Sequence, residues 1–179
     1  MKLLRAIRLD PSDTFVFEKA AEPGEWAVPG AFAFAHLDAT RLEGRARAAF
    51  RSGFLGIDSL GWSTLVQIVE ASEEDRVAAI EVLAQRLVER FGAPDLATAR
   101  PAAEEEIAFT ASLSEHPKGM LVALSRKYEG GAIREAFRTL TPAVGPKPLR
   151  AYAFLEVAGE EQPADEHVDL MTIAKGERT

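Results

Sequence analysis

Two adjacent glycines, Gly130 and Gly131, follow an apolar segment and precede a stretch with helical spacing. In that position their backbone N–H groups could bind a phosphate or a carboxylate. Arg126 and Arg134 lie close to them in the sequence, and His116 precedes the same apolar segment. These five residues form the candidate ligand site. The pattern has neither GxGxxG spacing nor a Walker A lysine, and a tight turn also requires glycine, so a turn without a ligand is the alternative.

A second group of basic residues belongs to a predicted helix. Arg41, Arg45, Arg47 and Arg51 stand against a single acid, Glu43, in a chain whose formal net charge is −7. A spacing of four residues places Arg41 beside Arg45 and Arg47 beside Arg51 on the exposed sides of the helix. We expect this surface to bind an acidic protein partner or the acidic C-terminal segment of the same chain. The alternative is a helix face that contacts only solvent.

Other chemistries lack the residues that they require. The chain has no cysteine, which excludes a disulfide framework, an iron–sulfur cluster, a zinc–thiolate site and a cysteine nucleophile. The three histidines, His36, His116 and His167, show no metal-ligand spacing on one element, and no GxSxG motif is present. We therefore expect no metal, no cofactor and no catalytic residue, and the sequence favours a non-catalytic protein over an enzyme without deciding the question.

The charge and hydropathy of the chain narrow the class of protein further. A length of 179 residues suits one domain with an ordinary apolar core. The negative charge argues against a general nucleic-acid-binding protein, since binding to phosphates needs a basic field. No apolar run approaches the roughly 18 residues of a membrane span, and the N-terminus does not resemble a signal peptide. We expect a cytoplasmic protein that binds neither nucleic acid nor a membrane.

The elements that would position these residues follow the order β-α-β-β-α-β between Trp62 and Ala158. They are a strand at 64–69, a helix from Ser72 to Phe91, a linker at 95–105, strands at 107–113 and 120–128, a helix at 133–140 and a strand at 151–157. This order is typical of a ferredoxin-like α+β fold, an antiparallel sheet with helices on one face. At Glu129, Gly130 and Gly131 the alternative is a second hairpin in place of the second helix.

Residues 1–61 are predicted to form a β-meander and a helix packed on that core. Strands are expected at 1–10, 15–17 and within 26–36, followed by a helix that starts at a capping box of Thr40 and Glu43 and ends at Gly53. The apolar loop that follows Gly53 is expected to pack down on the core. Residues 62–158 would form the ferredoxin-like core and residues 159–179 an acidic tail, all within one compact domain.

The strand at 64–69 is apolar on both faces, which is typical of a strand covered on two sides. Two helices on one face of the sheet would leave its other face exposed. The N-terminal segment or a second copy of the chain must therefore cover it. The sequence accordingly favours self-association as a homodimer, or a protein partner.

Several stretches resemble a family of alphaproteobacterial proteins known as a domain of unknown function. They are KLLRAIRLDPSDTFVFEKAAEPGEWAVPGAF, LEGRARAAFRSGFLG, GWSTLVQIVEA and AYAFLEV. The resemblance covers nearly the whole chain and implies no catalytic residue. It carries an association with accessory genes near molybdenum-dependent formate dehydrogenases and with lipoate-ligase-like proteins, which would imply a role in metalloenzyme maturation. We expect a non-catalytic binding or accessory protein for a protein partner or a small anionic ligand. The alternatives are a small enzyme acting on an anionic metabolite and a structural subunit of a larger complex.

Overall fold

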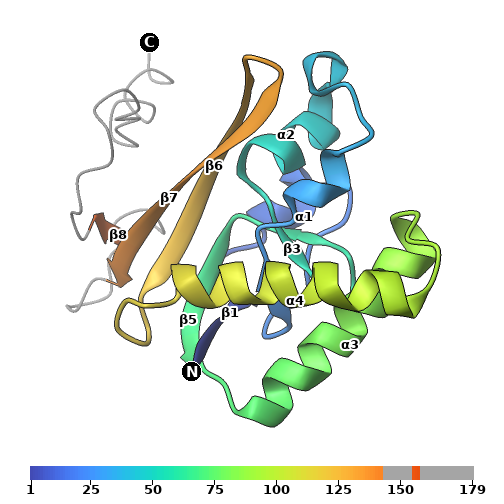
Figure 1. Cartoon of the computed structure of the whole chain (residues 1–179). Coiled ribbons are helices and arrows are strands. Elements are labelled where there is room, and N and C mark those ends of the chain that lie inside the picture. Colours follow the sequence, from blue (N-terminus) through green and yellow to red (C-terminus); the bar gives the residue numbers. More distant parts are fainter. Residues whose placement is uncertain (143–154, 158–179) are drawn as a thin grey trace.

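A computed structural model describes residues 1–142 and 155–157. Its strands form one antiparallel sheet in the order β4-β3-β2-β1-β5-β6-β7-β8 (Figure 1). The strands are β1 (Lys2–Ile7), β2 (Trp26–Val28), β3 (Phe54–Gly56), β4 (Trp62–Ser63), β5 (Leu65–Glu70), β6 (Leu121–Glu129), β7 (Ala132–Pro142) and β8 (Leu155–Val157). The helices are α1 (Ser12–Val16), α2 (Gly44–Ser52), α3 (Glu73–Arg90) and α4 (Leu96–Leu113), with short 3₁₀ turns η1 (Ala31–Phe34) and η2 (Ala39–Arg41).

Strand β1 lies in the middle of the sheet, where both of its faces are covered. Leu4 pairs with Ala27 of β2 on one side and with Ile68 of β5 on the other. Leu3 and Leu4 point to opposite faces, and their side chains are 1% and 0% exposed. The strands of the first 61 residues therefore belong to the same sheet as β5, β6 and β7.

The sheet is curled, so that strands far apart in its order approach each other. The ring centroids of Phe54 in β3 and Phe137 in β7 lie 6.3 Å apart, although four strands separate β3 from β7. The register places one set of buried side chains on the concave face, namely Leu4, Ala6, Ala27, Phe54, Val66, Ile68, Val122 and Leu124. This face of β5 is therefore covered by the sheet's own curvature.

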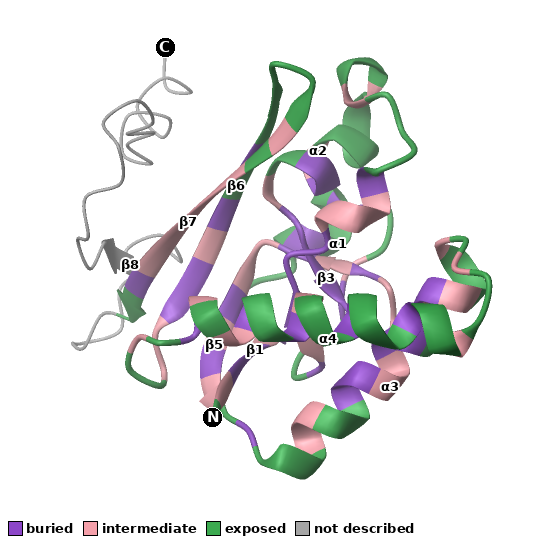
Figure 2. Ribbon diagram, in the orientation of Figure 1, coloured by how far each residue is buried: buried purple, intermediate pink, exposed green. Residues whose placement is uncertain are grey.

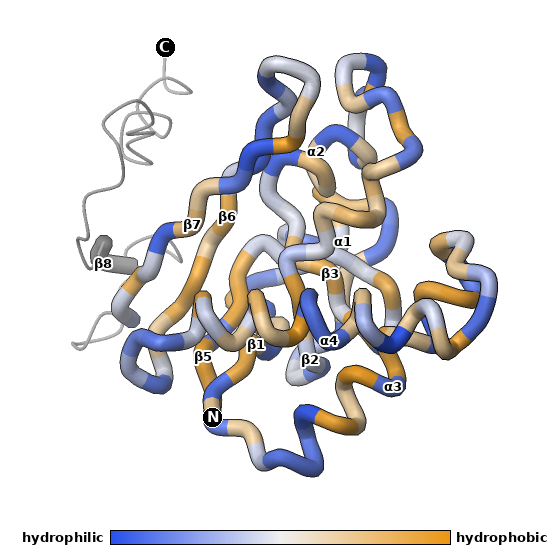
Figure 3. Tube along the Cα trace, viewed as in Figure 1, coloured by the Kyte–Doolittle hydropathy of each residue, from blue (hydrophilic) through white to orange (hydrophobic). Residues whose placement is uncertain are grey.

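The long helices α3 and α4 pack mainly against the opposite face, and Phe109 of α4 also contacts Phe137 at the concave face, with ring centroids 5.8 Å apart. Leu3, Val28 and Leu55 form a common core with the buried side chains of both helices. Figure 1 shows α4 lying across the sheet, where it packs on β1 and β2. In Figure 2 the buried residues gather along the strands and on the inner sides of the helices, while the tip of the β6–β7 hairpin is exposed. Figure 3 shows the matching pattern of apolar residues along β1 and β5.

The prediction of α3 is confirmed, including its start. The Ser72 hydroxyl accepts a hydrogen bond from the Asp75 backbone N–H, and the Asp75 carboxylate accepts one from the Ser72 N–H, which completes a capping box. The helix ends before Gly92, whose φ is +79°. The expected packing of the apolar loop after Gly53 is also confirmed, since Phe54 is fully buried.

The linker predicted at 95–105 and the strand predicted at 107–113 are both wrong, because α4 spans this region. Asp95 starts the helix by accepting a hydrogen bond from the Thr98 N–H at 2.7 Å. The buried residues then recur every three to four positions, at Ala99, Ala103, Ile107 and Thr110. Residues 107–113 alternate between apolar and more polar types, as in a strand, but this alternation does not match the positions that the helix buries.

The helix predicted at 133–140 is also wrong, because these residues belong to strand β7. Gly130 and Gly131 have φ values of +61° and +80°, which suits a two-residue hairpin turn matched to the twist of the strands. The alternative of a second hairpin at this position is confirmed. Because α4 and β7 replace a predicted strand and a predicted helix, the ferredoxin-like order is not confirmed, whereas an antiparallel sheet combined with helices is.

Smaller differences concern the N-terminal segment and the last strand. The strand predicted at 15–17 is wrong, since residues 12–16 form α1. The predicted capping box is wrong as well: Thr40 belongs to η2 and donates to Asp38, and α2 begins only at Gly44. The strand predicted at 151–157 is described only at β8, and residues 151–154 and 159–179 lie outside the described residues.

Candidate functional site

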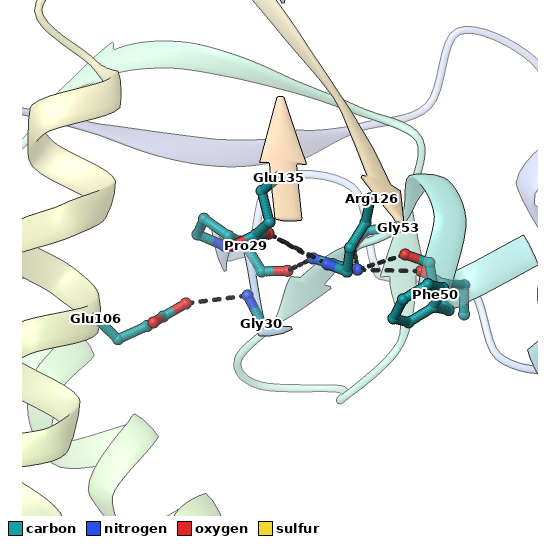
Figure 4. A network of polar contacts seen from close by, with 8 residues as sticks. Pro29, Gly30, Phe50, Gly53, Glu106, Arg126 and Glu135 are labelled. Atoms are coloured by element: carbon teal, nitrogen blue, oxygen red, sulfur yellow. Dashed lines mark hydrogen bonds and ion pairs between the residues drawn. The ribbon is translucent and has the colours of Figure 1, made fainter. Parts of the chain in front are cut away.

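Arg126 is the candidate site residue that the fold holds most firmly. It lies on the concave face of β6 and its side chain is 0% exposed. Its Nη2 donates to the Pro29 carbonyl at 2.6 Å and to Glu135 at 3.0 Å, and its Nη1 donates to the Phe50 carbonyl at 2.8 Å (Figure 4). The guanidinium therefore ties β6 to α2, to β7 and to the segment after β2.

No donor of this guanidinium is left for a ligand. Nε donates to Glu135 at 3.2 Å, and Nη1 also approaches the carbonyls of Ala49 and Gly53 at 3.4 Å. Several of these carbonyls belong to the C-terminal end of α2, where the helix dipole favours a cation. Burial lowers the pKa of Arg126, and the charge of Glu135 opposes that effect. Arg126 therefore acts as a structural cross-link, and anion binding by its side chain would require breaking these bonds.

A second half-buried carboxylate belongs to the same network. Glu106 of α4 accepts a hydrogen bond from the Gly30 backbone N–H at 3.0 Å. Loss of solvent raises the pKa of Glu106, while its bond to Gly30 and the charge of Arg126 lower it and the nearby Glu135 raises it further. Gly30 has a φ of +76°, and a Cβ atom there would lie 2.7 Å from Cβ of Leu55. The conformation of this segment therefore requires glycine.

The structure separates the other predicted ligand residues from Arg126. Gly130 and Gly131 are exposed at the hairpin tip. Arg126 pairs with Glu135, so the next pair along the ladder, Lys127 with Arg134, projects from the opposite face of the hairpin. Arg134 is exposed.

His116 lies at the other end of β6. It belongs to the loop between α4 and β6, where its carbonyl accepts a hydrogen bond from Lys2 Nζ at 2.5 Å. The five residue steps from Leu121 to Arg126 alone span roughly 17 Å. The five candidate ligand residues therefore do not converge on one site, and neither do the three residues on which a small enzyme for an anionic metabolite would depend, Arg126, Arg134 and His116.

The basic residues around α2 are exposed, as predicted, but they do not share one helix. Arg41 belongs to η2 and forms an ion pair with Asp38 at 3.3 Å. Arg45, Arg47 and Arg51 belong to α2 and are all exposed. The structure adds one fact that the sequence does not show, which is that Arg45 borders an apolar groove.

This groove, which we call the Trp62 groove, has a volume of about 330 Å³. Its floor includes the rings of Phe34 and Trp62, which stack with centroids 5.1 Å apart. Phe91 also lines it, and the cations Lys19 and Arg45 stand at its border. An exposed acid, Glu18, lies there too. The groove thus combines an aromatic floor with two cations and one anion.

The backbone fixes the position of the Trp62 ring. A Cβ atom at Gly53 would lie 2.8 Å from the ring, so only glycine allows this approach. The Trp62 N–H donates to the Lys19 carbonyl at 2.9 Å, and the Trp62 carbonyl accepts from the Ala21 N–H at 2.8 Å. Lys19 is therefore held beside the aromatic floor by backbone hydrogen bonds.

Sequence reasoning did not identify this groove. Its residues come from the segment after α1, from η1, α2 and β4, and from the end of α3. The only available signal was a tryptophan directly after a glycine-containing loop, which is equally typical of a core residue. The sequence predicted the basic helix but not the apolar groove beside it.

Within the described ranges, no group of three or more histidine, aspartate or glutamate side chains is placed to hold a metal ion. No helix in the described part of the chain is long and apolar enough to cross a membrane. Comparison with curated proteins and with solved structures finds no significant match. The sequence profile of a family of unknown function, DUF6505, matches residues 1–153, and the chain therefore belongs to that family.

Proposed function

We propose that the protein is a non-catalytic binding protein that holds an acidic segment of a partner protein, with an apolar side chain of that segment in the Trp62 groove. The observation that carries the proposal is the aromatic floor of the groove with Arg45 and Lys19 at its border. Aromatic side chains and arginine are the residue types most enriched at the energetic centres of protein interfaces.

The size of the groove suits one or two side chains. A volume of about 330 Å³ lies at the lower end of the range for small-molecule sites. Burying one large apolar side chain contributes roughly 1.5–3 kcal/mol, and an exposed ion pair adds roughly 0–1 kcal/mol. These contributions favour a weak and reversible complex, with affinity added by further contacts to Arg47 and Arg51 on the same helix.

Two small probes test the chemistry of the groove. Octanoate and 1-octanol have the same number of carbons but differ in charge, and Trp26→Phe leaves Trp62 as the only tryptophan. We expect both probes to change the emission of Trp62. Octanoate should bind about threefold to fivefold more tightly, because an exposed cation contributes on the order of 1 kcal/mol to an ion pair.

The matched control is a pair of arginines on α2. Arg45→Ala should remove the preference for octanoate, because Arg45 borders the groove. Arg51→Ala should leave the preference intact, because Arg51 is exposed on the same helix but does not line the groove. Equal affinities for the two probes in the Trp26→Phe protein, or no response of its Trp62 to either probe even when Leu170→Asp is added, would contradict the proposal.

A further inference from the structure

We propose that residues 165–173 of the same chain dock in the Trp62 groove and compete there with the partner. This inference rests on the proposed function, because it assumes that the groove accepts an acidic segment with an apolar side chain. The docking of this segment and the proposed function can each fail without the other, as the experiment below shows.

The C-terminal segment has the chemistry that the groove would recognise. Residues 165–173 read DEHVDLMTI, which holds three acids and four large apolar residues. Residues 158–179 hold six acids against two bases. The acids could face the cations at the border while Val168, Leu170 or Met171 enters the groove. No other stretch outside the described residues combines several acids with several large apolar residues in this way.

The charge of α2 complements that segment. Arg45, Arg47 and Arg51 carry three positive charges, and Glu43 at the start of α2 is its nearest acid in the sequence. Among the described residues, none of these three arginines forms an ion pair. Arginines with no acidic partner beside an apolar groove leave room for an acidic occupant, and the chain itself supplies one.

The segment is long enough to reach the groove. Val157 of β8 pairs with Leu140 of β7, and Phe137 of β7 approaches Phe54, which pairs with Ser63 beside Trp62. With about 5 Å from each Phe Cα to its ring centroid included, these steps place the end of β8 at most roughly 40 Å from the groove. The thirteen residue steps from Val157 to Leu170 can span up to about 43–47 Å.

A single spin label tests the docking in the full chain. The protein has no cysteine, so Thr172→Cys introduces one labelling site without further substitution. If the segment docks, the nitroxide should broaden the amide signals of groove residues such as Ala33, Leu37 and Ala46, and the indole signal of Trp62. Broadening on another surface, or spread evenly over the protein, would overturn the inference.

The matched variant is Leu170→Asp in the same labelled chain. It should abolish the broadening at the groove, because an acid cannot replace the apolar side chain there, and it should increase the affinity for octanoate at least threefold. Broadening that persists unchanged in this variant would overturn docking through the apolar residues. The amide spectrum of each variant also reports whether the domain is folded.

Octanoate separates the two proposals. If octanoate binds in the groove and the label causes no broadening there, the proposed function stands and the docking of the segment is overturned. If the label broadens the groove signals and octanoate binds neither the unsubstituted chain nor Leu170→Asp, the segment docks and the proposed function is overturned. If octanoate relieves the broadening in proportion to its binding, both are supported.

Discussion

Arg126 and Arg45 are both arginines from which the sequence predicts binding, yet their side chains have opposite environments. The guanidinium of Arg126 is fully buried and donates to Glu135 and to backbone carbonyls, including that of Phe50 at the end of α2. Arg45 is exposed on the same helix, at the border of an apolar groove. Arg126 fixes α2, which lines the groove, whereas the donors of Arg45 remain available to a ligand.

The difference shows what burial does to a cation. A buried guanidinium persists only when its donors are paired, because an unpaired buried charge is costly. Such pairing consumes the groups that a ligand would need. An exposed arginine contributes little to stability, but its donors stay available. We therefore expect a substitution of Arg45 to affect binding and a substitution of Arg126 to affect stability.

The largest effect should come from Arg126→Met. The substitution leaves Glu135 without its cation, and the Pro29 and Phe50 carbonyls without their donor. Breaking a buried pair in this way costs about 3–5 kcal/mol, measured as the free energy of unfolding in urea. The control is Arg51→Met on the exposed side of α2, which should cost less than about 0.5 kcal/mol. If Arg126→Met lowers the free energy of unfolding by less than about 1 kcal/mol, Arg126 is not the structural cross-link that distinguishes it from Arg45.

A somewhat smaller loss should follow from Gly30→Ala. The residue has a φ of +76°, and its new Cβ would lie 2.7 Å from Cβ of Leu55. A left-handed conformation costs an alanine roughly 1–2 kcal/mol, and overpacking adds about 1–3 kcal/mol. Gly92→Ala is the matched control, because Gly92 has a φ of +79° and nothing within 4 Å of the added atom. Urea unfolding should show that the Gly30 variant loses about twice as much stability or more; equal losses would mean that the segment yields to the extra methyl group.

The sequence predicted elements whose signals are local. Helix α3 carries a capping box, a buried stripe and a terminal glycine within its own residues. Helix α4 lacks a strong apolar stripe because two of its four buried positions are alanine (Ala99 and Ala103) and a third is threonine, so a short alternation around Ile107 outweighed the helical spacing. At Gly130 the local sequence allows both a helix start and a hairpin, and only pairing with β6 decides.

The two arginine environments could not be predicted, for a physical reason. The carbonyls that pair with Arg126 belong to residues 73 to 97 positions earlier in the chain. A backbone carbonyl is present at every residue, so the sequence contains no mark of which ones will be used. The Trp62 groove likewise exists only once α2, η1 and β4 have been brought together.

The pH dependence of stability should sharpen the comparison through Glu106. Burial raises the pKa of Glu106 above its ordinary value, so its contribution is full below the pKa of the unfolded chain, near pH 4, and is lost as the pH rises through the folded value. Glu106→Gln keeps an oxygen for the Gly30 N–H but carries no charge. We expect this variant to gain stability relative to the unsubstituted protein at pH 7 but not at pH 4.

The control for this effect is an exposed neighbour on the same helix. Glu105→Gln should show the same difference from the unsubstituted protein at both pH values, because Glu105 is exposed. Urea unfolding at pH 4 and pH 7 measures both variants. If Glu106→Gln instead loses stability at pH 7, the attraction of Arg126 outweighs desolvation, and the buried network is a favourable ion cluster at neutral pH.

The smallest effect on stability should come from Arg45→Ala. The side chain is exposed and forms no ion pair with any described residue, so its removal should change the free energy of unfolding by less than about 0.5 kcal/mol. The same variant should lose its preference for octanoate over 1-octanol, because the cation at the border of the groove is gone. A loss above about 1 kcal/mol would give Arg45 a structural role like that of Arg126. Unchanged stability with altered binding would instead show that Arg45 contributes to binding and not, like Arg126, to stability.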